Sequence, residues 1–272
     1  MTAQRPRPAI TAMWAWDNPV DPADDARGRG YVPAAPERLA AFARAGDLRD
    51  VHLLAPSGAT PGPVDGWLVD TVAALHDAGA TVSAVAGLHG ATPRWAQAVL
   101  TLAPFDRVQV AVVPWVAPPE GRTPPEVGRA AADALAAVTG AVAGAVPVDA
   151  CLPWWFATTA ADGGGSLLES VLPSTGRVAL AAPAAHAEGP DGVLALAAPG
   201  IEALVTAGVP FTVGVQVDTP DVAGGAGHTF FDEGPVALIR ECGTVAAALA
   251  GTPGFGGVAV KAHRSWRRLL GV

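Results

Sequence analysis

Residues 105–115 read FDRVQVAVVPW, and this stretch has the form of a buried β-strand that ends in a Pro-Trp corner. Valine is β-branched and favours strands, whereas proline cannot donate to the hydrogen-bond ladder of a sheet. A short run that is apolar on both faces is typical of a strand covered on both sides in a parallel sheet.

Similar short runs rich in Val, Ala and Leu recur along the chain, separated by longer Ala-rich segments with helical periodicity. The helical segments have the expected end signals: PERLAAFARAG starts at Pro36 and stops at Gly46, and VDGWLVDTVAALHDAG stops at Gly79, while a third runs from residue 124 to about Gly140. This alternation predicts βα repeats around a parallel sheet. With 105–115 included there are eight runs: 9–16, 50–56, 81–88, 105–115, 146–155, 177–183, 209–217 and 255–263.

We therefore predict that residues 1–272 form one α/β domain, a single closed (β/α)8 barrel, or TIM barrel. The length agrees with this, because such barrels typically have about 250 residues. An open doubly wound sheet is the alternative, but it needs a glycine-rich fingerprint after the first strand, and residues 14–25 read WAWDNPVDPADD. The βα loops after strands 1 and 7, residues 17–35 and 218–231, are long. Both belong on the C-terminal face, as lids or as plain surface loops.

The composition indicates a small molecule as the main partner. The chain carries a net charge of −8, with 50% apolar and 15% charged residues, which argues against nucleic acid or an anionic membrane as a partner. We find no breaker-free apolar run of about 18 residues and no signal-peptide cleavage site. We therefore expect a cytoplasmic protein, and the sequence does not indicate its oligomeric state. Cys151 and Cys242 form neither a disulfide framework nor a metal cluster.

Three pieces of the chain resemble bacterial TIM-barrel proteins of the glycoside-hydrolase-like kind, which are largely uncharacterised. The pieces are FDRVQVAVVPW at 105–115, VPFTVGVQV at 209–217 followed by TFFDEG at 229–234, and FGGVAVKAHRSW at 255–266. In the relatives the corresponding pieces look like FDG-x-x-L-D-x-E-P-Y, V-G-V-E-T and F-x-G-I-A-I-H.

The resemblance implies acidic residues on strands four and seven that this chain lacks. Ala111 and Val113 stand at the Asp and Glu positions of strand four, Gln216 at the strand-seven Glu, and Lys261 at the last-strand His. Glycoside hydrolysis normally uses two carboxyl groups, one as acid and one as nucleophile or base. We therefore do not expect the inherited glycosidase mechanism, since function depends on the site rather than on the barrel.

Strand alternation places a set of polar side chains in the barrel lumen beside the apolar wall of strand four. Lys261 is the most specific candidate, because it is the only lysine while arginine occurs sixteen times. It can serve as a base, a Schiff-base nucleophile or an anchor for an anion, or it can be a snorkelling or salt-bridged residue. The catalytic candidates are Lys261, Asp218, Gln216, Asp17 and His263.

Tryptophan is also unusually placed, since six of the eight tryptophans fall near the C-terminal ends of predicted strands 1, 4, 5 and 8. They predict an aromatic substrate pocket, with scattered core tryptophans as the alternative. The substrate-binding candidates are Trp14, Trp16, Trp115, Trp154, Trp155, Trp266, Gln109 and His228.

We expect a cofactor-independent enzyme of bacterial specialised metabolism that acts on a hydrophobic small molecule by cyclisation, isomerisation or elimination, the last being a lyase reaction. One alternative is a glycoside-type hydrolase with its acids relocated to Asp17, Asp218 or Glu188. Another is a non-catalytic, ligand-binding pseudo-glycosidase. We predict no metal site. The acidic residues Asp21, Asp24 and Asp25 are typical of a solvated loop, and the spacing of His89, His186 and His228 matches no zinc motif.

Overall fold

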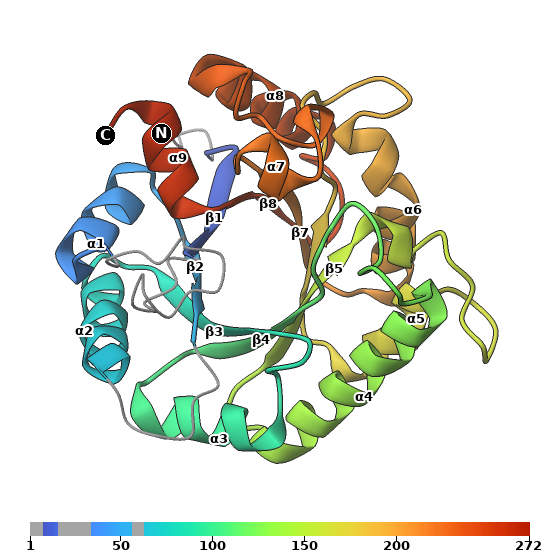
Figure 1. Cartoon of the computed structure of the whole chain (residues 1–272), viewed down its shortest axis with the longest axis horizontal. Coiled ribbons are helices and arrows are strands. Elements are labelled where there is room, and N and C mark those ends of the chain that lie inside the picture. The colour runs from blue at the N-terminus through green and yellow to red at the C-terminus, as the bar shows by residue number, and fades with distance from the viewer. Residues whose placement is uncertain (1–7, 16–33, 56–62) are drawn as a thin grey trace, which may run out of the picture.

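The computed structural model describes residues 8–15, 34–55 and 63–272. These form a closed barrel of parallel strands in sequential order around the ring (Figure 1). The predicted single (β/α)8 barrel is therefore confirmed, and the open doubly wound sheet is excluded. The strands are β1 (Ile10–Ala15), β2 (Asp50–Leu54), β3 (Thr81–Gly87), β4 (Arg107–Ala111), β5 (Val148–Pro153), β6 (Val178–Ala181), β7 (Phe211–Gln216) and β8 (Phe255–Lys261).

Helices surround the barrel, and proline begins several of them because its missing N–H is not needed in the first turn. α4 continues past Gly140, where the sequence predicted its end, and stops before Ala143 in a left-handed conformation. No helix in the described ranges is long and apolar enough to cross a bilayer. The helices are α1 (Pro36–Ala45), α2 (Pro63–Asp77), α3 (Pro93–Leu102), α4 (Pro124–Val142), α5 (Leu167–Val171), α6 (Val193–Ala207), α7 (Pro220–Ala223), α8 (Gly234–Ala248) and α9 (His263–Leu270).

Apolar side chains form two separate cores, because successive strand residues point to opposite sides of the sheet. The larger core fills the space between the strands and the helices. The smaller one lies in the lumen, where alanine and glycine leave room for the large ring of Trp14. A Cβ atom on Gly214 would lie 3.2 Å from Cη2 of Trp14. The lumen core consists of Ala12, Trp14, Val85, Ala111, Trp115, Cys151, Ala179, Ala181 and Ala259.

The barrel closes around a glycine in β8. The register of β8 shifts against both of its neighbours, between Ile10 and Ala12 of β1 and between Phe211 and Val213 of β7. Gly257 lies at this irregularity with φ +121°, and a Cβ there would come within 2.3 Å of Thr11 Oγ1. Only glycine adopts such a conformation without strain, so this point of the sheet favours glycine.

Replacing Gly257 by alanine is therefore expected to lower the free energy of unfolding by about 2 kcal/mol or more, through backbone strain and the clash with Thr11. Gly140→Ala is the matched control, because Gly140 lies inside α4 with nothing within 4 Å of its Cβ position. It should raise stability by about 0.5–1 kcal/mol. Urea titrations of both variants measure the difference, and equal stability of the two would contradict the role of Gly257.

Candidate functional site

A chain of buried polar groups crosses the lumen from β1 to β2. Trp14 Nε1 donates a hydrogen bond to Gln109 Oε1 at 2.8 Å, and Gln109 Nε2 lies 3.4 Å from His52 Nδ1. The rings of Trp14 and His52 are 5.1 Å apart, and all three side chains are buried. Sequence reasoning missed His52. Its only signal was the alternation of DVHLL, in which Val51 and Leu53 join the outer core and His52 faces the lumen.

A network of ion pairs lies at the N-terminal ends of the strands. Asp149 accepts two hydrogen bonds from Arg107, at 2.6 and 2.5 Å, and lies 3.2 Å from Arg177, which also contacts Asp50 at 2.9 Å. The hydrogen bonds that Arg107 donates to Asp149 raise the pKa of the Arg107 guanidinium further. These interactions join β2, β4, β5 and the residue before β6 at the N-terminal end of the barrel. Barrel enzymes build their active sites at the opposite, C-terminal end.

His52 is neutral inside the folded protein. Burial, together with the positive charges of Arg177 and Arg107, lowers the pKa of its imidazole well below the ordinary value of 6.5. An unfolded chain regains the ordinary pKa and takes up a proton below about pH 6.5, whereas the folded protein does not. Acid therefore favours the unfolded state through this residue.

We expect the free energy of unfolding to fall as the pH is lowered from about 6.5, with His52 contributing up to about 1.4 kcal/mol per pH unit. His52→Gln should make this dependence flatter. His186→Gln is the control, because it removes an exposed imidazole that pairs with Asp191 at 3.1 Å, and it should change the slope less than His52→Gln does. Urea unfolding between pH 5 and 7.5 measures the slopes, and an unchanged slope in His52→Gln would contradict the prediction.

Lys261 and Asp218 form an ion pair at the C-terminal ends of β8 and β7. Lys261 Nζ lies 3.2 Å from Asp218 Oδ2, and the two side chains are 13% and 11% exposed. The ammonium also lies 5.0 Å from the ring centre of Trp115, close enough for a cation–π interaction. Ser265 Oγ donates to Asp218 Oδ1 at 2.9 Å. The pairing agrees with the alternation of the two strands and combines an amine, a carboxylate and an indole at one point.

The loop after β7 is anchored to the strand end, and this fixes Asp218. Gln216 Nε2 donates to Ala223 O at 3.1 Å, and Thr229 Oγ1 donates to the Asp218 carbonyl at 2.6 Å. The amide of Gln216 is thus already engaged in holding the loop. His228 lies in the same loop, half-buried, with Nδ1 3.2 Å from Pro183 O.

Four of the predicted site residues lie outside the lumen. Trp155 packs on Phe156 in the outer core, and Trp154 packs against the same core. His263 and Trp266 both pack on Phe42 of α1, at 5.0 and 5.1 Å.

The physical reason is the end of strand periodicity. β5 ends at Pro153 and β8 at Lys261, and helical turns follow both, so alternation no longer decides where the side chains point. Within the described residues the lumen aromatics are Trp14 and Trp115, whose rings lie 5.2 Å apart, with His52 beside Trp14. Trp16, Asp17, Asp21, Asp24 and Asp25 lie outside the described residues.

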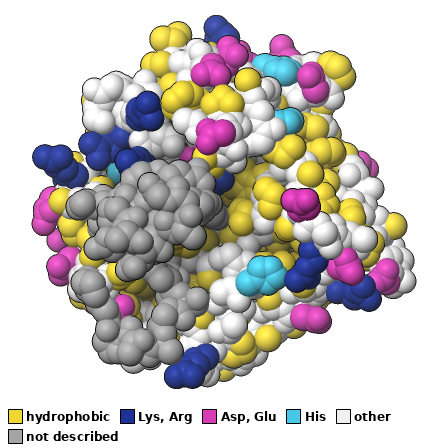
Figure 2. Space-filling model, viewed as in Figure 1, with side chains coloured by type: hydrophobic (Ala, Val, Ile, Leu, Met, Phe, Trp, Pro, Cys, Tyr) yellow, Lys and Arg dark blue, Asp and Glu magenta, His cyan; other side chains and the backbone are white. Residues whose placement is uncertain are grey.

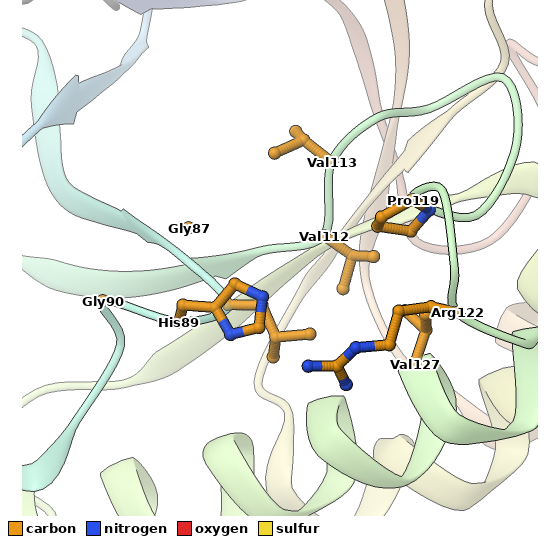
Figure 3. A pocket seen from close by; sticks show the side chains of 9 residues that line it. Gly87, His89, Gly90, Val112, Val113, Pro119, Arg122 and Val127 are labelled. Atoms are coloured by element: carbon orange, nitrogen blue, oxygen red, sulfur yellow. The ribbon is translucent and has the colours of Figure 1, made fainter. Parts of the chain in front are cut away.

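A separate pocket opens between the ends of β3 and β4, with a cavity of about 170 Å³. Figure 3 shows its lining, which is apolar except for an imidazole and a guanidinium. Hydrophobic side chains are also exposed around the middle of the molecular face in Figure 2. The lining residues are Gly87, Leu88, His89, Gly90, Val112, Val113, Pro119, Arg122 and Val127.

The described residues contain no group of three or more His, Cys, Asp or Glu that could hold a metal ion. The thiols of Cys151 and Cys242 are buried, and burial raises the pKa of each to about 12. Both thiols are therefore protonated at neutral pH and are poor nucleophiles. Glu188 is exposed in the loop between β6 and α6.

No protein-family model matches the chain, and no curated protein matches its sequence. Solved structures do share its fold. An endo-β-N-acetylglucosaminidase from Cordyceps militaris is 14% identical over 98% of this chain and 91% of its own, with a TM-score of 0.53. Active domain 2 of a thermostable chitinase from Pyrococcus furiosus is 15% identical over 94% and 84%, with a TM-score of 0.53. A xylanase and α-amylase inhibitor protein from Scadoxus multiflorus is 9% identical over 96% and 98%, with a TM-score of 0.55.

At these identities the likeness concerns the fold alone, so the comparisons support the (β/α)8 barrel and assign no activity. The same architecture occurs in proteins described as hydrolases and in one described as an inhibitor. The fold therefore does not select the activity.

Proposed function

We propose that this chain is an enzyme that transforms a hydrophobic small molecule by isomerisation, elimination or cyclisation, using Lys261 and Asp218 as its acid–base groups and no bound cofactor. The observation that carries the proposal is the 3.2 Å pair of Lys261 Nζ and Asp218 Oδ2 on the ring of Trp115. It lies at the C-terminal ends of the strands, where barrel enzymes place their chemistry.

The pair is suited to moving one proton in each direction. An ammonium can protonate a developing oxyanion while a nearby carboxylate removes a proton from carbon. The hydrogen bond from Ser265 to Asp218 Oδ1 holds the carboxylate in place and leaves Oδ2 directed to the amine. Because both side chains are mostly buried, their electrostatic effect on a bound substrate is stronger than it would be in water.

The amine can also form a Schiff base with a carbonyl substrate. Asp218 would accept a proton from the Lys261 ammonium, and the free amine would attack the carbonyl carbon. Asp218 would then return the proton to the hydroxyl of the carbinolamine, which leaves as water when the C=N bond forms. The iminium that results acidifies the neighbouring C–H bond, as isomerisation or elimination requires.

The surroundings of the pair support an apolar substrate rather than a sugar. Ala111, Ala259 and Trp115 belong to the apolar lumen core, and Val113 packs against it. Alanine and valine cannot exchange hydrogen bonds with the hydroxyl groups of a carbohydrate, whereas an indole face stacks on flat apolar molecules.

The sequence makes a direct test simple, because Lys261 is the only lysine. The protein is incubated with a panel of apolar aldehydes, ketones and polycyclic carbonyl metabolites, reduced with borohydride, and analysed by intact mass and peptide mapping. We expect a reduced adduct on Lys261 with one group of related carbonyl compounds. Lys261→Arg, which keeps the charge, should lose that adduct and retain only labelling of the chain's α-amine.

Asp218→Asn is the second variant, because it keeps the shape of the carboxylate but cannot accept the proton. It should slow adduct formation by about 100-fold or more. Labelling at the α-amine alone, identical in the parent and in Lys261→Arg, would contradict the Schiff-base route. Binding of the same compounds without adduct or turnover would identify a ligand-binding barrel.

A glycoside hydrolase remains the second candidate function, supported by the fold likeness to hydrolases and by Asp218 beside a largely buried amine and an indole. It needs a second carboxyl group about 5–9 Å from Asp218. Hydrolysis of chito-oligosaccharides that disappears in Asp218→Asn, but persists in Lys261→Arg, would favour this candidate.

A further inference from the structure

We propose that the pocket between β3 and β4 binds a small organic monocarboxylate whose apolar part has the size of one six-membered ring. The pocket is lined by the β3–α3 and β4–α4 loops, whereas Lys261 and Asp218 follow β8 and β7. The proposal therefore does not depend on the proposed function.

The size and the floor of the pocket define the apolar part of the ligand. The cavity measures about 170 Å³, and Leu88, Val112, Val113 and Val127 contribute its aliphatic lining. An engineered apolar cavity of about 150 Å³ in another protein holds one benzene molecule. An occupant with a ring of six carbons therefore fits this space, whereas a sugar would place its hydroxyl groups against four hydrocarbon side chains without hydrogen bonds.

The polar lining defines the charged part. Arg122 and His89 reach over the floor from opposite loops, and Figure 3 shows the guanidinium directed toward the imidazole. A guanidinium presents paired N–H donors that match the two oxygens of a carboxylate, and a neutral imidazole supplies one N–H donor as well. No residue of the described lining is acidic, so no carboxylate of the lining repels an anion at this end.

Glu126, an acidic residue of α4 near Arg122, forms hydrogen bonds at the start of the helix. Glu126 interacts electrostatically with Arg122, but its Oε2 accepts hydrogen bonds from Thr123 N and Thr123 Oγ1, both at 2.8 Å. These bonds form the capping box of α4, and they lower the pKa of Glu126. Glu126 is therefore directed to the helix start, and a carboxylate ligand can approach Arg122 from the pocket.

One lining position allows the cavity to be filled without a clash. A Cβ atom on Gly87 would meet no atom of the described residues within 4 Å, and Gly87 is not in the left-handed region. Because Gly87 lines the pocket, we expect leucine at this position to narrow it and to compete with the ligand.

The test is an NMR titration with benzoate and cyclohexanecarboxylate, with benzamide as the neutral compound of matching shape. We expect the carboxylates to bind at least tenfold more tightly than benzamide. Arg122→Gln should weaken carboxylate binding at least tenfold, and Gly87→Leu should abolish binding of all three compounds. The control Arg129→Gln removes an exposed arginine of α4 that is paired with Asp162 at 3.4 Å, and it should change affinity less than twofold.

Lys261→Met should also leave the affinity within twofold, which separates this pocket from the proposed catalytic pair. The proposal is overturned if neither carboxylate binds, if benzamide binds as tightly as benzoate, or if Gly87→Leu leaves binding unchanged while remaining folded by circular dichroism. Arg122-dependent binding of inorganic phosphate with no gain from an apolar ring would also overturn it.

Discussion

Replacing Asp149 by alanine is expected to lower the free energy of unfolding by about 3–5 kcal/mol. Asp149 is buried and accepts hydrogen bonds from Arg107 and Arg177, whose side chains are themselves only 21% and 19% exposed. Removing the carboxylate leaves two largely buried cations close to each other without the anion between them. The repulsion and the lost hydrogen bonds both act on the folded state, because the unfolded chain solvates the arginines in water.

Urea unfolding followed by far-UV circular dichroism measures this loss. Asp149→Asn keeps the volume and one acceptor oxygen but removes the charge, so it should also be strongly destabilising. Asp162→Ala is the control, because its pair with Arg129 is exposed and 3.4 Å long. We expect it to change stability by less than about 1 kcal/mol. A loss at Asp149 as small as that at Asp162 would contradict the role given to the buried network.

Truncating Trp14 to alanine should destabilise the protein by about 3–5 kcal/mol. The indole is fully buried in the centre of the lumen and contacts both His52 and Trp115. Many of its lumen neighbours are alanines, and Gly214 also lies against the ring, so these small residues cannot fill the cavity. The variant would also leave Gln109 Oε1 without its buried donor, which adds about 1–3 kcal/mol to the loss or admits a water molecule.

Trp14→Phe separates these contributions, because it keeps an aromatic ring and removes the N–H group. We expect Trp14→Phe to lower the free energy of unfolding relative to the parent, but by less than Trp14→Ala does. Trp154→Ala is the control, since Trp154 is only partly buried at the edge of the outer core, and it should cost clearly less. Equal losses for Trp14→Ala and Trp154→Ala in urea titrations would show that the lumen is not tightly packed around the indole.

The arrangement of the candidate site was predictable only where strand alternation applies. Gln109, Ala111 and Ala259 face the lumen as the period of two requires, and Lys261 meets Asp218 across β8 and β7. Trp266 and His263 were misplaced because α9 begins immediately after β8. The change from strand to helix alters the direction of every later side chain. The short sequence after Lys261 gives no clear signal for where this change occurs.

The buried charges could not have been predicted from the sequence. Arg177 contacts Asp50 across 127 positions in the chain, and nothing local to either residue indicates the other. His52 likewise acquires its low pKa from burial and from two arginines distant in the sequence, Arg177 and Arg107. Such pairs form only when the barrel closes and brings the N-terminal ends of distant strands together.

The sequence by itself determined the eight apolar runs, their alternation with helices and hence the closed barrel, because these depend on local periodicity and on turn residues. It also determined that Ala111 and Val113 stand at the two strand-four positions where the proteins that this chain resembles have Asp and Glu. Only the tertiary structure decided which polar groups meet: Lys261 with Asp218 at one end, Asp149 with its arginines at the other, and His89 opposite Arg122 in the pocket. The physical reason is that contacts between side chains depend on distances and burial across the ring of strands, which a linear pattern of residue types does not contain.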